Sequence, residues 1–316
     1  KTSPSPFAIQ KFLRRLVREG CTHAVLEYSS HGLVQGRMLF TWPQVAAITN
    51  TSREHLDYHG TLEQYRKDKG ELFRMLKGKG TKILNRDDET YDKYLQIPSA
   101  QTLSYSLSDP VTSKISLRIP GTFNMENALC ATGCALACGI PIEDCCKALR
   151  TFAGIPGRME RIDEGQTFTV FIDFTVTPQA YRKTLTAVRA MLPKGKRLFV
   201  LTGSCGDRMR EKRPVIGQIV SSYADIMVVT NEDPYTENPE QIINEVLSGI
   251  DQTTTIAHRI IDRREAIEFL LQKAEPGDMV LLCGKGSDTT MWTKEGQIPW
   301  DEREITCSLL RKKFSP

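Results

Sequence analysis

The sequence lacks long apolar runs and a charge excess of either sign. No stretch approaches about 18 uninterrupted apolar residues, the length a membrane-spanning helix needs, and residues 279–283 are among the longest apolar runs. The 42 Lys and Arg residues nearly balance the 38 Asp and Glu residues, so the net charge is +4. A balance this close to neutral predicts no binding of nucleic acid by itself. We therefore expect a soluble protein that binds neither a membrane nor a nucleic acid.

The cysteines show neither a disulfide framework nor a metal-binding pattern. There are nine of them, an odd number, with no CxxC pair and no His at metal-ligand spacing. Cys130, Cys134 and Cys138 recur every four residues among Ala and Leu, which indicates one face of a packed helix rather than a thiolate site. This use of cysteine is typical of the reducing cytoplasm, where we expect the protein to be located.

What the sequence does have is the composition of an ordinary globular protein. With 316 residues, 40% of them hydrophobic and 25% charged, the chain is long enough for about two domains. Aliphatic runs alternate with helical patterns, which predicts an α/β fold with parallel sheets. Turn residues interrupt the pattern at 153–157, and we place the domain boundary there, between 1–155 and 156–316.

The two halves differ in how regular their patterns are. The first half predicts strands at 24–27 and 45–49, a hairpin or two strands within 102–117, and helices at 9–17, 62–76 and 125–137. The second half predicts strands at 168–173, 198–202, 226–230 and 279–283 between helices near 178–191, 215–223, 239–248 and 264–273. This alternation indicates a doubly wound domain, in which ligands bind at the carboxyl ends of the strands. Those ends carry Asp173 and the segments 203–208, 231–235 and 284–288.

Polar residues that could bind a metal follow two predicted strands of the first half. Glu27 ends one of these strands, and the segment 49–60, which contains His55, follows the next. A carboxylate and an imidazole at neighbouring strand ends can converge on Mg²⁺. The alternative is a Glu that caps a helix and a His paired with a carboxylate, and spacing leaves both interpretations open.

Two nucleotide-binding motifs are absent. The glycine-lysine runs at 78–81 and 284–287 do not match the P-loop pattern GxxxxGK[ST] between a strand and a helix. No GxGxxG follows a predicted strand, because 203–206 has the wrong spacing, so a dehydrogenase has little support.

Six segments in a fixed order resemble the Mur ligases, and the MurE type in particular. The longest is TNTSREHLDYHG at 49–60, and the others span nearly the whole chain, at 26–33, 121–129, 155–160, 206–208 with 212–214, and 284–288 with 298–303. The resemblance implies the distal part of a P-loop-type ATPase domain followed by a Rossmann-like C-terminal domain. It also implies an ATP-dependent ligase that adds the third amino acid to UDP-N-acetylmuramoyl-dipeptide in peptidoglycan synthesis, through an acyl phosphate and with Mg²⁺.

The resemblance also assigns roles to residues of this chain. The Mg²⁺ ligands and catalytic groups would be Glu27, His55 and Lys69, the last of these at the position of a carbamylated lysine. The ATP contacts would be Asn124, Asn127, Arg158 and Asp173. The nucleotide-sugar substrate would contact Thr2, Ser3, Ser29 and Arg37. The amino-acid substrate would contact Arg208, Glu232, Asp233, Tyr235, Gly284 and Asp288.

Without the resemblance, several of these residues have simpler interpretations. Lys69 would be a solvated helix lysine, the Asn pair would cap a helix, and Arg158 would form a surface ion pair. The serines and Arg37 would be polar residues of turns and of the surface.

The chain departs from the family pattern in several places. The family's P-loop and uridine-binding domain should lie upstream of Lys1, so we expect the chain as given not to turn over ATP. Val176 stands where the family carries a His in its Asp-Tyr-Ala-His-Thr-Pro stretch, and the segment 103–121 is shorter than expected.

The Asp-Asn-Pro-Arg loop of diaminopimelate enzymes reads Glu-Asp-Pro-Tyr at 232–235. Tyr235 cannot offer the bidentate fork with which Arg binds a distal carboxylate. The family's Gly-Lys-Gly-His-Glu motif reads Gly-Lys-Gly-Ser-Asp at 284–288. Ser287 therefore stands in place of the His, and Asp288 has a shorter side chain than the Glu.

Other functions remain open on these residues. One is a Mur-ligase homologue with a different acyl acceptor, such as a folate-like or amino-acid polymer substrate, and another is a module that binds ligands without catalysis. For an active ligase we expect domain closure about a hinge near 154–157.

Overall fold

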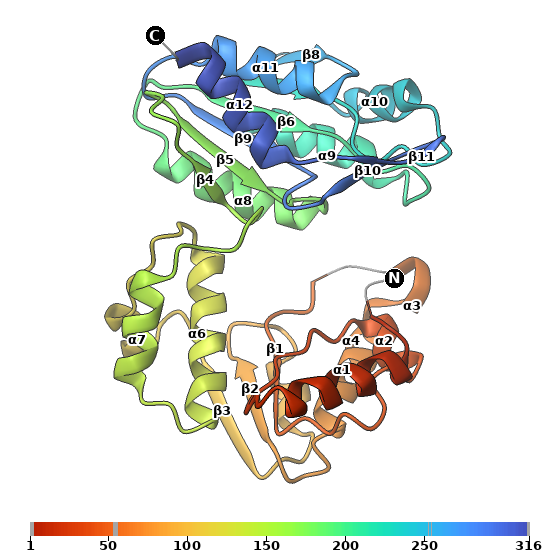
Figure 1. The fold of residues 1–316 in the computed structure, drawn as a ribbon, viewed down its shortest axis with the longest axis vertical. Helices are drawn as coiled ribbons and strands as arrows, with labels where there is room; N and C mark the ends of the chain where they lie inside the picture. The colour runs from red at the N-terminus through yellow and green to blue at the C-terminus, as the bar shows by residue number, and fades with distance from the viewer. Residues whose placement is uncertain (1–2, 53–55, 252, 254, 315–316) are drawn as a thin grey trace. The chain divides into compact units, whose positions relative to one another are not determined.

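The computed structural model describes residues 3–52, 56–251, 253 and 255–314, with the backbone alone at 57 and 314. The chain divides into two compact units (Figure 1). The first unit consists of Lys1–Leu117 and Phe123–Thr151, and the second consists of Arg118–Thr122 and Phe152–Pro316. Among the described residues, no helix is long and apolar enough to cross a membrane.

The first unit is built on a three-stranded parallel sheet in the order β1-β2-β3. Its strands are β1 (Val45–Ile48), β2 (Thr81–Asn85) and β3 (Gln101–Tyr105). Helices α4 (Leu62–Arg74) and α5 (Tyr91–Leu95) pack on one face, and α6 (Thr122–Ala137) and α7 (Ile142–Thr151) pack on the other. Successive strand residues point to opposite faces, so Ile83 packs toward α6 and Leu84 toward α4.

Three short or exposed helices complete this unit. They are α1 (Pro6–Arg18), α2 (Ser30–Val34) and α3 (Leu56–His59). Ser5 caps α1 by accepting a hydrogen bond from the backbone N–H of Ala8. Helix α2 contacts α4, and this contact positions the residues discussed below.

Two predictions for the first unit are wrong. Residues 24–27 are not a strand, and Val25 is fully exposed. A strand needs a neighbour for its backbone N–H and C=O groups, and none of the three described strands pairs with this segment. The second strand expected within 102–117 is instead a 3₁₀ helix, η1 (Pro110–Lys114), because Pro110 has no N–H for a strand ladder and favours the first turn of a helix.

The second unit contains a six-stranded sheet in the order β4-β5-β9-β6-β7-β8. Its strands are β4 (Glu160–Ile162), β5 (Thr169–Asp173), β6 (Leu198–Thr202), β7 (Ile226–Val229), β8 (Ile256–Arg259) and β9 (Met279–Cys283). All neighbours are parallel except β4 and β5, which are antiparallel. The doubly wound α/β fold is therefore confirmed, while β4 and β8 were not predicted because they are short and partly polar.

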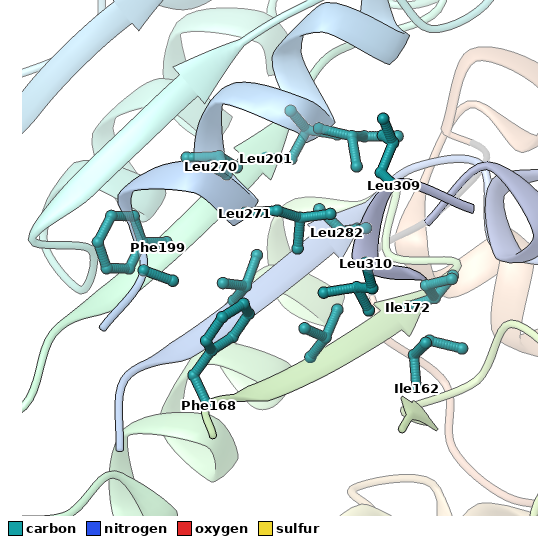
Figure 2. Close-up of a cluster of buried hydrophobic side chains, with 14 of the residues drawn as sticks. Ile162, Phe168, Ile172, Phe199, Leu201, Leu270, Leu271, Leu282, Leu309 and Leu310 are labelled. Carbon is teal, nitrogen blue, oxygen red and sulfur yellow. The ribbon is translucent and has the colours of Figure 1, made fainter. Parts of the chain in front are cut away.

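Helices cover both faces of this sheet. Helices α11 (Arg263–Lys273) and α12 (Glu302–Phe314) pack over Phe199, Leu201 and Leu282 (Figure 2). Helices α8 (Pro178–Met191), α9 (Lys212–Ser221) and α10 (Pro239–Leu247) lie on the other side (Figure 1). Every residue of β6 and β9 is buried, as expected for parallel strands between two helix layers. A hairpin of β10 (Thr290–Thr293) and β11 (Gly296–Pro299) precedes α12.

Candidate functional site

Three of the four residues predicted to contact the nucleotide-sugar substrate lie together in the first unit. The Oγ atoms of Ser3 and Ser29 are 2.8 Å apart, and Nη1 of Arg37 donates to the backbone carbonyl of Ser3 at 2.8 Å. We call these three residues the serine cluster. Ser3 and Ser29 are 26 positions apart in the chain, so only the fold brings them together. Thr2, the fourth residue, lies outside the described residues.

The short helix α2 positions the serine cluster. Ser29 is the N-cap of this helix, and its Oγ accepts a hydrogen bond from the backbone N–H of Gly32 at 3.1 Å. A Cβ atom at Gly32 would lie 2.8 Å from Ser3 Oγ and 3.0 Å from Ser29 Oγ. Glycine at this position therefore allows the two serines to contact each other.

The predicted Mg²⁺ ligands are only partly described. Glu27 is exposed, in the irregular segment before α2, rather than at the end of a strand as expected. His55 lies outside the described residues. Lys69, on α4, donates from Nζ to the backbone carbonyl of Asn50 at 3.1 Å, in the loop that follows β1. Within the described ranges, no three His, Cys, Asp or Glu side chains gather as a metal site.

A second histidine, His59 at the end of α3, is buried between α2 and α4. His59 Nδ1 lies 2.6 Å from Asp68 Oδ2, and its Nε2 lies 3.0 Å from Ser30 Oγ. Pairing with a carboxylate, the alternative considered for the histidine of the segment 49–60, is seen at His59, while for His55 it stays a prediction. The His59 ring also contacts Tyr65, whose ring lies 5.1 Å from Lys69 Nζ.

The two predicted ATP contacts of the first unit start helix α6. Asn124 and Asn127 are three positions apart in the first turns of this helix, so they lie on the same side of it. Asn124 is half-buried and Asn127 is exposed. The helix packs against the sheet, with Ala128 and Leu129 in the same buried cluster as Ile83.

The two predicted ATP contacts of the second unit also lie side by side. Asp173 ends β5 and is buried, and its Oδ2 accepts a hydrogen bond from the backbone N–H of Met159 at 2.8 Å. Burial raises the pKa of the Asp173 carboxyl, although bonds from Thr175 and Met159 oppose the rise. Arg158 donates to the carbonyl of Phe174 at 3.2 Å and lies over its ring at 4.7 Å. The expected surface ion pair of Arg158 is replaced by this aromatic contact.

Two loops approach each other closely beside Arg158. A Cβ atom at Gly157 would lie 2.2 Å from the backbone N of Ser287, and one at Gly286 would lie 2.7 Å from Phe174 Cβ. Gly157 has a φ of 68° and Gly286 a φ of 49°, a region that disfavours other residues. These glycines therefore allow the run at 284–287 to pack against the loop that carries Arg158.

Three side chains from separate segments form a stack at the loop predicted to select the amino acid. The Tyr235 ring is stacked with the Trp292 ring at 5.6 Å with an interplanar angle of 23°. The Arg208 guanidinium lies 5.3 Å from the centre of the Tyr235 ring. We call Arg208, Tyr235 and Trp292 the aromatic stack. Tyr235 has a φ of 50°, which is unusual for a residue with a side chain.

The loops carrying Arg208 and Tyr235 are held together by a buried arginine. Arg213 is fully buried and donates to both carboxylate oxygens of Glu237, at 2.9 and 3.0 Å. Glu237 in turn accepts from the backbone N–H of Asp207 at 2.6 Å. A Cβ atom at Gly206 would lie 1.9 Å from the carbonyl oxygen of Pro234, so the two loops touch. The pKa of Glu237 is lowered to about 2, mainly by the hydrogen bonds from Arg213.

A buried lysine joins the other predicted amino-acid contacts. Lys285 Nζ lies 2.9 Å from Asp233 Oδ1 and 3.0 Å from Asp288 Oδ2. Burial lowers the pKa of Lys285, but the bonds to both carboxylates outweigh this effect and raise it. Asp233 Oδ1 also accepts from the backbone N–H of Trp292 at 2.9 Å. Asp288 keeps 42% of its side chain exposed, so it can also face a ligand.

Glu232 lies deeper than a ligand contact would require. It is 3% exposed, and its Oε1 accepts a hydrogen bond from Cys205 Sγ at 2.9 Å. Burial raises the pKa of the Glu232 carboxyl. A Cβ atom at Gly284 would lie 2.6 Å from Glu232 Oε2, so the absence of a side chain at Gly284 makes room for this carboxylate. Glu232 is therefore placed to hold the loops of Cys205 and Gly284 rather than to contact a ligand.

Sequence reasoning missed several residues that shape these sites. Trp292 follows the site loop by 57 positions and has no motif of its own, and the spacing of Ser30, His59 and Asp68 gives no sign that they meet. The sequence does contain a signal for Lys285 as a site residue, because this lysine lies in a glycine-rich run directly after a predicted strand.

Comparisons with known proteins identify the family of this chain. Residues 1–114 match the family model for the Mur ligase middle domain, and residues 157–286 match that for the Mur ligase glutamate ligase domain. UDP-N-acetylmuramoyl-L-alanyl-D-glutamate–2,6-diaminopimelate ligase of Geobacillus thermodenitrificans is 33% identical over 99% of this chain and 69% of its own length. A solved structure of a ligase with the same name has a TM-score of 0.65 and 30% identity, covering 100% of this chain and 70% of that one.

More distant structures share the fold. The MurF ligase of Thermotoga maritima in complex with ADP has a TM-score of 0.60 at 15% identity, covering 86% of this chain and 62% of that one. The Geobacillus ligase is more than 30% identical to this chain, and more than two thirds of its length is matched. This similarity is sufficient to assign the family. The chain belongs to the Mur ligase family.

Proposed function

We propose that this chain is the ATPase and amino-acid-binding part of a MurE-type ligase, with the boundary near 155/156. The reaction joins UDP-N-acetylmuramoyl-dipeptide to an amino acid in the cytoplasm. The observation that carries the substrate assignment is the serine cluster, because residues far apart in the sequence meet at the positions expected to hold the nucleotide-sugar peptide. All nine cysteines are free, which suits a reducing compartment.

A carboxylate reacts poorly with an amine, and the proposed reaction first converts it into a more reactive acyl phosphate. An oxygen of the dipeptide carboxylate attacks the γ-phosphorus of ATP, so an acyl phosphate forms and ADP leaves. The amine of the amino acid then attacks the acyl carbon, and phosphate leaves as the amide bond forms. Both steps bring anions together, so cationic groups such as Arg158 near the phosphates would lower the barrier. The ADP complex of the MurF relative is consistent with a nucleotide on this fold.

A Mg²⁺ ion belongs to this proposal as a prediction on Glu27, His55 and Lys69. The described residues do not assemble three metal-binding side chains, so we assign no step to the ion. Lys69 Nζ contacts Asn50, in the loop that carries His55 in the sequence. An uncharged amine can take up CO₂, and the resulting carbamate supplies the oxygen ligands that Mg²⁺ prefers.

The aromatic stack supports an amino acid without a distal carboxylate. In place of an Arg fork, the loop offers the Tyr235 ring, which contacts Arg208 and Trp292. The half-exposed carboxylate of Asp288 would attract a distal amine and repel a distal carboxylate. We therefore propose that lysine, or another amino acid with no distal carboxylate, is preferred over diaminopimelate.

The test is phosphate release by the full-length natural protein, supplied with UDP-N-acetylmuramoyl-dipeptide, ATP, Mg²⁺ and a panel of amino acids. We expect release that requires both the nucleotide-sugar peptide and one amino acid of the panel. Arg37→Ala should raise the KM for the nucleotide-sugar peptide, whereas Arg15→Ala, at an exposed ion pair on α1, should not. No release with any amino acid would contradict the proposal.

The same assay tests the amino-acid assignment. Tyr235→Arg should increase the use of diaminopimelate relative to lysine, because Arg binds a second carboxylate bidentately. Tyr235→Phe keeps the ring and is the control, which should leave the ratio unchanged. A wild-type protein that prefers diaminopimelate would overturn this part of the proposal while leaving the ligase function intact.

A further inference from the structure

A buried chain of hydrogen bonds connects the serine cluster with the helix of Lys69. Ser30 on α2 follows Ser29, and Asp68 on α4 precedes Lys69. His59 lies between them, 3.0 Å from Ser30 Oγ and 2.6 Å from Asp68 Oδ2. The side chain of His59 is fully buried, and that of Asp68 is 15% exposed. One imidazole therefore links α2, whose N-cap is Ser29 of the serine cluster, to α4, which carries Lys69.

The chemistry of the three groups sets the direction of the hydrogen bonds. An ionised carboxylate only accepts, so His59 Nδ1 carries a proton and donates it to Asp68. In a neutral imidazole the other nitrogen is then an acceptor, and the Ser30 hydroxyl donates to Nε2. The Asp68 carboxylate thus selects the tautomer and, through it, the orientation of the Ser30 hydroxyl.

The order Asp-His-Ser resembles the arrangement that activates a serine nucleophile, but burial argues against that role. Ser30 is 4% exposed and begins α2, so its Oγ is not open to a substrate. Around the imidazole, the rings of Tyr58 and Tyr65 lie at 4.9 and 5.3 Å. Tyr65 is also buried, and its ring lies 5.1 Å from Lys69 Nζ. The surroundings are those of a rigid link rather than of a reacting group.

We propose that His59 is a positioning residue that fixes the serine cluster relative to Lys69 through its bonds to Ser30 and Asp68. This proposal rests on the proposed ligase function. It implies that breaking either bond lets α2 shift against α4, so that the bound nucleotide-sugar peptide is misaligned with the groups on α4. Misalignment of this kind lowers kcat and raises the KM for that substrate, without an equal effect on the other substrates.

The experiment compares variants that break one bond at a time in the full-length protein. His59→Gln can retain the bond to Ser30 and loses the bond to Asp68, while His59→Asn can retain only the bond to Asp68. Ser30→Ala removes the hydroxyl, and Asp68→Asn removes the negative charge that selects the tautomer of His59 but keeps an acceptor oxygen; both change the volume little. For each variant we expect kcat/KM for the nucleotide-sugar peptide to fall about ten- to hundredfold, as for a lost bond to a charged group, with a smaller change for Ser30→Ala. The KM for the amino acid should stay within about twofold of the wild-type value.

Gln64→Ala is the matched control. Gln64 donates to the other oxygen of Asp68 at 2.7 Å on the exposed side, so its removal leaves the bond to His59 in place. Its kcat/KM should stay close to that of the wild type. A double-mutant cycle with Ser30→Ala and Asp68→Asn should be non-additive, because both variants break the same chain through His59.

The outcomes separate the two proposals. Unchanged kinetics in folded variants, or additive effects in the cycle, would overturn the positioning role and leave the ligase function intact. A fall in unfolding temperature with unchanged kcat and KM would show a purely structural role and would likewise overturn it. A wild-type protein that ligates no amino acid to the nucleotide-sugar peptide would overturn both proposals.

Discussion

In the first unit the serine cluster lies around the short helix α2 and on the segment before α1, whereas in the second unit the predicted amino-acid contacts lie on loops that follow strands of a six-stranded sheet. The serine cluster is held by hydrogen bonds between hydroxyl, carbonyl and guanidinium groups at a half-buried surface. The loops that carry the predicted amino-acid contacts are held by ion pairs of the fully buried cations Arg213 and Lys285 with Glu237 and Asp233.

This difference has a physical consequence. A buried charge is costly once its partner is lost, so the loops of the second unit should be coupled strongly to the stability of their unit. A hydroxyl at a half-buried surface can be replaced by water, so changes in the serine cluster should affect substrate binding more than folding. The variants below test this contrast, from the largest expected effect to the smallest.

Arg213→Ala should have the largest effect. It leaves Glu237, which is 10% exposed, without its bidentate partner and also removes the bond to Glu245. We expect the second unit to lose about 3–5 kcal/mol of its free energy of unfolding, measured by urea titration with hydrogen exchange to assign the loss to β6 and β9. Arg210→Ala is the control, because Arg210 pairs with the same Glu237 but is 56% exposed, and it should cost about 0–1 kcal/mol. Equal effects of the two variants would contradict the contrast.

A core substitution compares the two sheets directly. Leu282 on β9 is fully buried between the helix layers, and its change to Ala should cost about 2–5 kcal/mol through lost burial and a cavity. Leu103 on β3 is only partly buried, so Leu103→Ala should cost about 1 kcal/mol. Thermal unfolding monitored by circular dichroism and hydrogen exchange measures both changes. A larger loss at Leu103 would show that the smaller sheet is the more tightly packed one.

A pair of helix caps separates stability from binding in the first unit. Ser29 and Ser5 each cap a helix, through hydrogen bonds from Gly32 and Ala8, so each change to Ala should cost about 1 kcal/mol. Ser29 also contacts Ser3, and Ser5 has no bond to the serine cluster. We expect only Ser29→Ala to weaken binding of the nucleotide-sugar peptide, measured by calorimetry. The same loss of affinity in Ser5→Ala would mean that helix stability rather than direct contact controls binding.

The last comparison concerns a slope, the pH dependence of stability, rather than a total loss of stability. In the folded protein the pKa of Glu237 is about 2, below its ordinary value of 4.5, because Arg213 and the Asp207 N–H donate to the carboxylate. Glu237 therefore stabilises the fold above pH 4.5, and this contribution is lost as the pH falls toward 2. Glu237→Gln should flatten the decline of stability over that range in urea titrations at several pH values. A Glu240→Gln variant is the exposed control, and an equally steep decline in Glu237→Gln would contradict the assignment.

The regular elements followed well from the sequence, whereas the contacts of the site did not. Helices α4, α6, α8 and α11 begin and end within three residues of the predicted bounds, because apolar spacing and caps are local properties. The segment 24–27 has the apolar character of a strand but no partner in the described sheets, and pairing is not a local property.

By itself the sequence determined the α/β class, the doubly wound second unit and the family, because periodicity and ordered motifs are written along the chain. Only the tertiary structure decided that Ser3 meets Ser29, that Tyr235 stacks on Trp292 and that His59 joins Ser30 to Asp68. The partners in these contacts come from different elements, separated by up to 57 positions, and no local preference specifies which side chains meet. That choice is made when the apolar faces of strands and helices are buried together and the remaining polar groups must find partners.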